Sequence, residues 1–288
     1  MRRPRLLGAL LAGILLGGCH LPGSPEARKV VTIAILPAYS LDVMARRYLP
    51  FMEYLSRETG YRMEYVSSLS YSHYLGVVEH SRVDFGFQNP LLFQILKKTR
   101  GAYPVAQVVG PGGSLVERGV IVARADSGIQ EIGQLKGKRV MATSKSALVG
   151  YLAQAQRLVE AGVQPEGEVR IIRGGKQDEL LMRVLLGGRV DAVFVREAAL
   201  KAVEGSAALA RIRIIGTTDF FPTWCLAAFP ETDPTVVSRV QEAVLKLTAE
   251  NPEQASLLEA MGAVRFVVPD PEQYRKVLDL VAALGVPL

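Results

Sequence analysis

The sequence predicts an α/β protein of two lobes, each a mostly parallel sheet flanked by helices, joined by two crossover hinge strands. Residues 81–87 (SRVDFGF) and 188–194 (GRVDAVF) are near copies of each other. Each of these segments stands at the end of a stretch with the predicted element order β-α-β-α-β. Two extended segments, 119–124 and 211–217, lie outside these stretches. Alternating strands and helices give parallel sheets covered by helices, so the duplication indicates two such sheets.

The elements of the two copies correspond one to one. In both copies the first helix is followed by a glycine, Gly60 or Gly162, a residue that commonly ends helices. The first copy is expected to contain strands 30–36, 62–66 and 83–87 and a second helix 71–79. The second copy is expected to contain strands 139–142, 169–173 and 190–195 and a second helix 178–186.

The end of the chain is expected to return to the first sheet. A strand at 224–229 and helices at 233–250, 252–261 and 271–284 follow the second crossover segment. The predicted organisation is therefore lobe 1, residues 30–116 and 218–288, with lobe 2, residues 117–217, inserted into it.

The N-terminus predicts a lipoprotein signal peptide. Three arginines precede an apolar run at 6–16, which ends in Leu16-Gly17-Gly18-Cys19. This pattern is typical of secretory signals, and its ending resembles the lipobox of bacterial lipoproteins, in which the cysteine is acylated. The alternative is an uncleaved anchor, but the run is short for a membrane span of about 20 residues. We expect residues 1–18 to be removed, Cys19 to carry lipid, residues 19–29 to form a tether, and the protein to face the periplasm or cell exterior.

Composition argues against several classes of function. The 34 Lys and Arg exceed the 28 Asp and Glu by six, and three of those arginines lie in the signal, so the charge indicates no nucleic-acid binding. Besides Cys19, Cys225 is the only thiol, so no internal disulfide is expected. The three histidines have no metal-ligand spacing, and no acid, base and nucleophile set can be named. We expect no catalytic residue, metal or cofactor.

The loops at the carboxyl ends of the strands are the predicted ligand site. Ligands of open α/β sheets bind there, and two facing lobes bring six such loops to one cleft. The alternative for Asn89, which Pro90 follows, is a helix N-cap alone. The candidate ligand-binding residues are Tyr39, Ser40, Tyr71 and Asn89 from lobe 1, and Ser144, Lys145, Ser146, Arg173, Lys176, Arg196 and Glu197 from lobe 2.

Several motifs resemble one family. They are SYSHYLGVVEHSRVDFGFQNPLLF, ADSGIQEIGQLKGKRV, GYL at 150–152, GGRVDAVF and FPTW, in that order. The chain from about residue 30 to 270 thereby resembles the phosphate/phosphite/phosphonate (PhnD-like) solute-binding proteins of ABC importers, which have the type II periplasmic binding-protein fold. The resemblance implies a small solute as ligand, a membrane permease as partner and no catalysis. A monomer is expected.

The sequence departs from the family where a ligand binds. The family's Ser-Thr-Ser, which binds phosphonate oxygens, is replaced by Ala147, Leu148 and Val149. The family has a tyrosine after the Pro-Leu pair, where this chain has Phe93. The family has another tyrosine in the crossover strand, where this chain has Glu117. A histidine of the family is missing from this chain, which has Asp178 near that place. The family's Tyr-Asp pair is replaced by Arg196-Glu197.

These departures leave the ligand open. Cations and helix-mouth amides in lobe 2 favour an anion, and the apolar residues 147–149 favour an organic one, carboxylate or phosphorylated, over phosphate or a simple alkylphosphonate. The alternative is a sensor or interaction module that binds a partner protein with the same two lobes.

Overall fold

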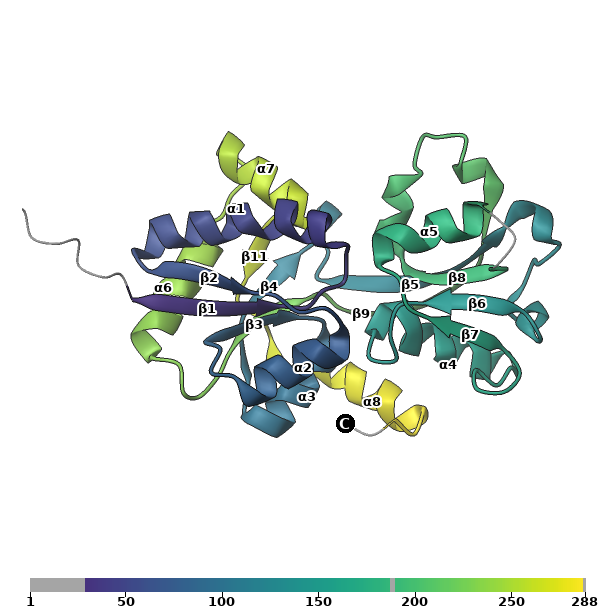
Figure 1. Ribbon diagram of the computed structural model, residues 1–288, viewed down its shortest axis with the longest axis horizontal. Helices are drawn as coiled ribbons and strands as arrows, with labels where there is room; N and C mark the ends of the chain where they lie inside the picture. The colour runs from purple at the N-terminus through teal and green to yellow at the C-terminus, as the bar shows by residue number, and fades with distance from the viewer. Residues whose placement is uncertain (1–28, 187–189, 287–288) are drawn as a thin grey trace, which may run out of the picture.

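The computed structural model describes residues 29–186 and 190–286, and it contains two lobes side by side (Figure 1). Lobe 1 contains a six-stranded sheet in the order β11-β4-β10-β3-β1-β2, and lobe 2 a five-stranded sheet in the order β7-β6-β8-β5-β9. Helices flank both sheets, so the predicted fold class is confirmed. Cys19 and the rest of the predicted signal and tether lie outside the described residues, apart from Lys29.

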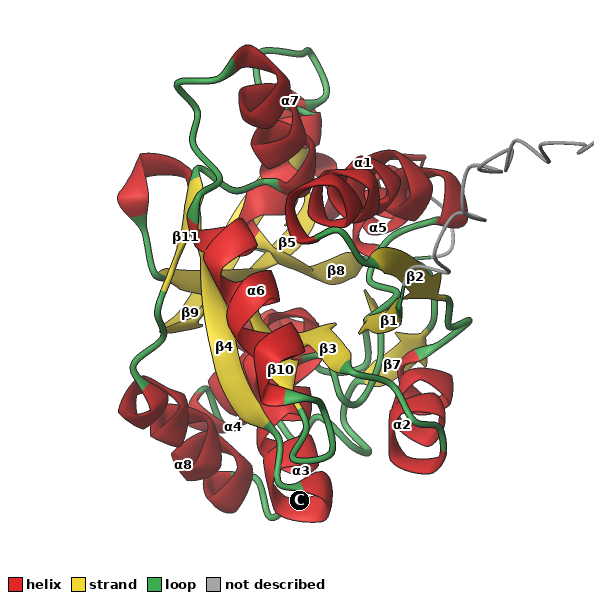
Figure 2. Ribbon diagram, turned by 90° about the vertical axis from the view of Figure 1, so that its left-hand side faces the viewer, coloured by secondary structure: helices red, strands yellow, loops and turns green. Residues whose placement is uncertain are grey.

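Lobe 1 combines the part of the chain before residue 116 with its C-terminal part. Its strands are β1 (Val30–Ile35), β2 (Arg62–Val66), β3 (Phe85–Gln88), β4 (Tyr103–Val109), β10 (Cys225–Ala228) and β11 (Arg265–Val267). Its helices are α1 (Leu41–Thr59), α2 (Tyr71–His80), α3 (Pro90–Arg100), α6 (Pro234–Leu245), α7 (Pro252–Met261) and α8 (Lys276–Ala283). Helices α1 and α7 lie on one side of the sheet, and α2, α3 and α8 lie on the other (Figures 1 and 2).

Lobe 2 is formed by the middle of the chain. Its strands are β5 (Val116–Arg124), β6 (Arg139–Ala142), β7 (Arg170–Arg173), β8 (Ala192–Arg196) and β9 (Ile212–Pro222). Its helices are α4 (Ala153–Glu160), which a π-helical turn at Leu148–Leu152 precedes, and α5 (Gln177–Leu186). Helix α5 covers one face of the sheet, where a buried apolar cluster includes Val122, Leu180 and Val193, and α4 covers the other face (Figure 1).

The internal duplication is visible in the sheets. Strands β2-β1-β3 are parallel and have antiparallel β10 beside them, and strands β7-β6-β8 are parallel and have antiparallel β5 beside them. Gly60 and Gly162 both adopt the left-handed conformation, with φ of 76° and 72°, just after the first helix of each copy. These positive φ values explain why glycine stands at both positions.

The repeated Val-Asp motif has a structural role in both lobes. The Asp84 carboxylate accepts hydrogen bonds from the backbone N–H (2.8 Å) and hydroxyl (2.9 Å) of Thr32 in β1. The Asp191 carboxylate accepts them from the backbone N–H (2.8 Å), Nε and Nη2 of Arg139 in β6. Each aspartate therefore fixes the first strand of its copy to the third.

The crossing points differ from the predicted segments. Residues 119–124 and 212–217 lie inside the sheet of lobe 2, where β5 and β9 pair from Arg124 with Ile212 to Val116 with Pro222. Just beyond this ladder, the Thr223 N–H donates to the Leu115 carbonyl at 3.0 Å. Because sheet pairing persists to the end of β9, the chain steps between the sheets next to Val116 and Pro222.

The C-terminal region contacts both lobes. Helix α6 ends at Leu245, before the predicted residue 250, and the last predicted helix is a 3-10 turn (Pro271–Arg275) followed by α8. Helix α8 contacts α3 of lobe 1 and α4 of lobe 2. Among the described residues, no helix combines the length and the apolar character that a membrane span needs.

Candidate ligand-binding site between the lobes

A small cavity lies between the two lobes. It has a volume of about 10 Å³, which is room for about one water molecule. It is lined by Ala38, Tyr71, Asn89 and Trp224 of lobe 1 and by Ala147, Leu148, Val149, Gly150 and Arg196 of lobe 2. The lobes are therefore close together, and residues near the ends of strands from both sheets form the walls.

The wall from lobe 2 is mainly a turn and the start of a helix. After β6, the Ser144 carbonyl accepts from Ala147 N (3.1 Å) and the Ser144 hydroxyl from Ser146 N (3.3 Å). The helix opens with a π-type bond from Leu152 N to the Ala147 carbonyl (3.0 Å). The stretch thus presents buried apolar residues 147–149 and the N-terminal backbone of a helix to the cavity, and such N–H groups attract anions.

Asn89 contacts both lobes. Its Oδ1 accepts from Leu92 N at 2.9 Å and caps α3, with Pro90 at the first helical position. Its Nδ2 donates to the Ser146 carbonyl at 3.3 Å across the lobe boundary. Helix capping, one of the two interpretations of this residue, is therefore present together with a contact to the lobe 2 turn.

Arg196 is the main charged group of the cavity wall. Its guanidinium lies over the rings of Tyr39 (5.2 Å to the centroid) and Trp224 (5.6 Å), both in lobe 1. Its Nη1 is 3.3 Å from Oε2 of Glu117 on the neighbouring strand β5. The side chain is 15% exposed, so these cation–π contacts and the ion pair form away from bulk water and are stronger for it.

Glu117 is largely buried beside Arg196. Burial raises the pKa of Glu117 to about 8 and lowers that of Arg196 to about 10, because both lose hydration of their charged forms. Glu117 Oε1 is buried and has no hydrogen-bond partner within the described chain. Next to this pair, Arg118 of β5 and Glu197, which follows the end of β8, form a two-point ion pair with N–O distances of 2.9 and 2.5 Å.

The other predicted lobe 2 cations lie at different places. Lys176 Nζ donates to the backbone carbonyls of Pro37 (2.7 Å) and Leu69 (3.4 Å) in lobe 1, so it links the lobes. Arg173 donates to the Tyr151 hydroxyl (3.1 Å) and to Glu166 within lobe 2.

The remaining predicted residues lie at the margins. Lys145 is exposed in the turn after β6, and Ser40 is half-buried at the start of α1. The structure thus brings Tyr71, Asn89 and Arg196 to one cavity, with Tyr39 stacked on Arg196. The ligand-binding roles of all these residues stay predictions.

Several buried polar groups in the strand-end loops and on β5 were not among the predicted residues. Ser68 Oγ and Thr143 Oγ1 are buried without a hydrogen-bond partner in the described structure, like Glu117 Oε1. Ser68 and Thr143 belong to the loops after β2 and β6, which the strand-end rule indicated, and Glu117 stood out as a departure from the family. Trp224 was indicated only as the first residue of the expected strand 224–229 and as the last residue of the FPTW motif.

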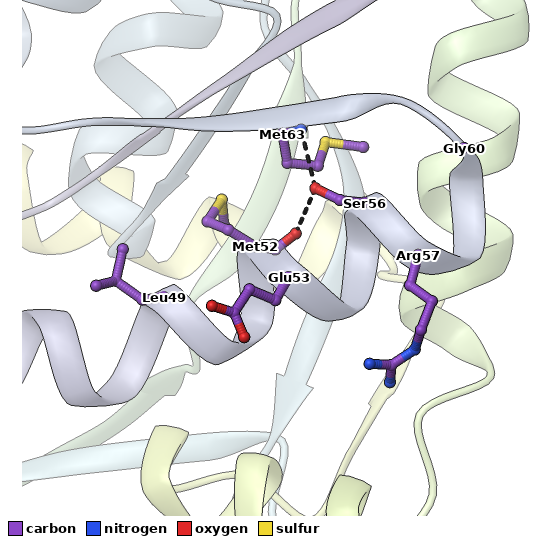
Figure 3. A pocket seen from close by; sticks show the side chains of 7 residues that line it. All are labelled: Leu49, Met52, Glu53, Ser56, Arg57, Gly60 and Met63. Atoms are coloured by element: carbon purple, nitrogen blue, oxygen red, sulfur yellow. Dashed lines mark hydrogen bonds between the residues drawn. The ribbon is translucent and has the colours of Figure 1, made fainter. Parts of the chain in front are cut away.

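A larger hollow of about 580 Å³ lies elsewhere, along α1 and β2 of lobe 1 (Figure 3). There Ser56 Oγ donates to the Met52 carbonyl (2.8 Å) and accepts from Met63 N (3.0 Å). Ser56 is therefore hydrogen-bonded within lobe 1. Only residues of lobe 1 line this hollow, whereas both lobes line the inter-lobe cavity.

Comparison with known proteins decides the family. Residues 33–274 match the model of the ABC transporter, phosphonate, periplasmic substrate-binding proteins. The chain belongs to this family. The predicted recognition is confirmed, and because the family is one of binding proteins, it supports the expectation that the chain is not an enzyme.

Two relatives of this chain have names that describe different activities, import and sensing. The chain is 30% identical over 152 residues to the phosphate-import protein PhnD of Mycolicibacterium smegmatis, covering 50% of this chain and 45% of that protein. It is 26% identical over 261 residues to the tetrathionate sensor histidine kinase TtrS of Salmonella typhimurium, covering 80% and 42%. The chain thus spans less than half the length of either relative.

The fold is that of a solved family structure. A binding protein component of an ABC phosphonate transporter from Pseudomonas aeruginosa superposes with a TM-score of 0.80 at 17% identity, covering 88% of this chain and 85% of that one. At this identity the likeness supports the fold and leaves the ligand open.

Proposed function

We propose that this family member binds a small organic anion, carboxylate or phosphorylated, between its lobes and delivers it to an ABC permease. One observation carries the proposal: Arg196, whose side chain is largely buried, lines the inter-lobe cavity, and the Glu117 carboxylate beside it has one buried oxygen, Oε1, without a hydrogen-bond partner among the described residues. Buried polar groups in folded proteins almost always have hydrogen-bond partners, so a ligand or water between the lobes is the natural partner.

The charge around the cavity supports an anion. Arg196 lines it, and the helix that begins at residue 148 directs its N-terminal backbone toward it. Arg binds carboxylate or phosphate through paired hydrogen bonds. The apolar wall at 147–149 favours a ligand with a carbon skeleton over bare phosphate.

Delivery requires the lobes to separate and close. Asn89 and Lys176 make hydrogen bonds across the lobe boundary, and the chain passes between the two sheets next to Val116 and Pro222. Two neighbouring crossing points make hinge closure the natural motion. We place the mature protein outside the cytoplasmic membrane, held by lipid on Cys19 and acting as a monomer with its permease.

The second candidate is a sensor or interaction module, which the likeness to part of a tetrathionate sensor kinase brings up. The family description, which names transporter binding proteins, favours import over sensing.

A thermal-shift panel of carboxylates, organic phosphates, phosphate and methylphosphonate tests the proposal. A ligand at 100 times its Kd should stabilise the protein by about 2.7 kcal/mol, a readily measured shift. Loss of that shift in Arg196→Lys, which keeps the charge but not the paired donors, would support the site. An unchanged shift in this variant, or a shift with phosphate alone, would contradict it.

A further inference from the structure

A buried glutamine lies where the chain passes between the two sheets. Gln107 belongs to β4, which pairs with β10 and β11 inside the sheet of lobe 1, and its side chain is fully buried. Its Nε2 donates to the Leu115 carbonyl at 3.0 Å and to the Thr223 hydroxyl at 3.1 Å. Leu115 directly precedes β5 and Thr223 directly follows β9, so one side chain of lobe 1 holds the chain at both crossing points.

The backbone at the crossing points is tied to the same strand. The Thr223 N–H donates to the Leu115 carbonyl at 3.0 Å. The Thr223 hydroxyl, which accepts from Gln107, donates in turn to the Val108 carbonyl, and the Val108 N–H donates to the Trp224 carbonyl at 3.0 Å. Hydrogen bonds in such a chain polarise one another and are stronger where water is excluded. The crossing points are therefore fixed to β4 and should move with lobe 1.

The C-terminal turn completes this cluster. Gln273, in the turn Pro271–Arg275, pairs its side-chain amide with that of Gln107. Its Nε2 donates to Gln107 Oε1 at 2.6 Å, and its Oε1 accepts from Gln107 Nε2 at 3.3 Å. The turn is held to lobe 1 by Tyr274, which is fully buried and has its ring centre 5.0 Å from that of Phe93. Gln273 therefore orients the Gln107 amide so that Nε2 lies toward the crossing points.

A second fixed point lies a few residues away, in lobe 2. The pairing of β5 with β9 is irregular at Gly119, whose N–H donates to the Thr218 hydroxyl at 2.9 Å. Gly119 also packs closely on Gln154 of helix α4, since a Cβ at this position would lie 2.1 Å from Gln154 Nε2. Gly119 and Thr218 are thus fixed parts of lobe 2. Between them and the Gln107 cluster, only the short stretches 116–118 and 219–222 remain.

We propose that Gln107 is a hinge lock: by holding both crossing points to lobe 1, it confines the bending between the lobes to residues 116–118 and 219–222. A shorter flexible stretch permits a smaller rotation, so the lock limits how far the lobes separate when no solute is bound. Without it, bending extends into residues 110–115 and 223–224, and the lobes open wider. The inference rests on the proposed function only in assuming that the lobes move, and it holds for any solute.

Gln107→Met tests the lock, because methionine has a similar size and flexibility but cannot form these hydrogen bonds. Small-angle X-ray scattering of the ligand-free full chain should give a larger radius of gyration than for the wild type, which a loss of stability alone does not produce. Hydrogen–deuterium exchange at the Thr223 amide should be about tenfold faster, the range expected for losing one buried hydrogen bond.

Gln241→Met is the matched control. Gln241 Nε2 donates to the Val105 carbonyl at 2.8 Å, so this variant also removes a glutamine hydrogen bond to β4, but away from the crossing points. Its radius of gyration and its Thr223 exchange rate should both equal those of the wild type.

The lock is overturned if Gln107→Met keeps the wild-type radius of gyration or the wild-type exchange rate at Thr223, or if Gln241→Met changes them as much. Should Gln107→Met fail to fold, Gln273→Met decides by the same two measurements, since it removes the partner of Gln107 from a half-buried position. Failure of the lock leaves the proposed function standing, because the thermal-shift panel measures solute binding independently of these variants.

Discussion

Lobe 1 and lobe 2 order their first three strands alike and fix them with aspartates at matching positions, Asp84 and Asp191, yet their facing edges differ in chemistry. The edge of lobe 1 presents neutral groups, the Tyr71 ring, the Asn89 amide and Trp224. The edge of lobe 2 presents the charged pair Glu117–Arg196 and a helix N-terminus. The repeated residues maintain the fold, and the residues that differ between the lobes are the ones that face the cavity.

This difference divides the work of binding between the lobes. Aromatic rings of lobe 1 cover Arg196 and keep water from it, which strengthens its electrostatic interactions. Lobe 2 supplies the charge. Variants of the two edges should therefore differ in the size of their effect and in their dependence on pH.

The largest difference is expected between Arg196→Ala and Asn89→Ala. Removing Arg196 takes away the cation beside the buried Glu117 carboxyl and the contacts with the Tyr39 and Trp224 rings, which together should lower the free energy of unfolding by roughly 3 kcal/mol. Removing the Asn89 cap should cost about 1 kcal/mol. Urea denaturation at pH 8 measures both, and Arg196→Ala combined with Glu117→Gln should recover part of the loss. Equal losses of unfolding free energy in Arg196→Ala and Asn89→Ala would contradict the claim that the charged groups at the cavity belong to lobe 2 alone.

The shared framework is tested by Asp84→Ala and Asp191→Ala. Each removes the acceptor of a backbone N–H in the first strand of its copy and should cost about 1–3 kcal/mol of unfolding free energy. Urea denaturation should give similar values for the two variants. A large loss for one and none for the other would break the structural equivalence of the lobes.

Much of the framework could be predicted from the sequence, because alternation and repetition leave few arrangements of strands and helices. Gly60, Gly162 and the two Val-Asp motifs occupy equivalent places, as predicted. The sites of the charged side chains could not be predicted. Lys176 and Arg173 lie in the expected loops, but their long side chains extend to Pro37 and Tyr151. The hydrophobic pattern of a sequence does not show which group a long side chain contacts. The pairing of Glu117 with Arg196 depends on antiparallel register, which a single sequence does not define.

The pH dependence of stability should trace to lobe 2. Burial raises the pKa of Glu117 from 4.5 to about 8, so the folded state holds this proton more tightly than the unfolded chain. Stability from this group is therefore present below about pH 4.5 and is lost as the pH rises through 8. Glu117→Gln should flatten the fall in melting temperature between pH 5 and pH 8, measured by calorimetry on the ligand-free protein. An unchanged profile would show that Glu117 titrates normally.

The smallest effect on stability is expected for Lys176→Met. The variant removes the hydrogen bonds from Lys176 to lobe 1 and should change the free energy of unfolding by less than about 1 kcal/mol. It should nevertheless shift the ligand-free protein toward separated lobes, seen as a larger radius of gyration in small-angle X-ray scattering. Lys138→Met, at an exposed position of lobe 2, is the control. An unchanged radius would mean that Lys176 does not hold the lobes together.

The most direct test of binding between the lobes uses Trp224, the single tryptophan of the chain, which lines the cavity and is 7% exposed. Its emission should change saturably when a ligand found in the thermal-shift panel is added. The midpoint should match the calorimetric Kd, and Arg196→Lys should move both together. A ligand that stabilises the protein while the Trp224 emission stays constant through saturation would place binding elsewhere and contradict the account.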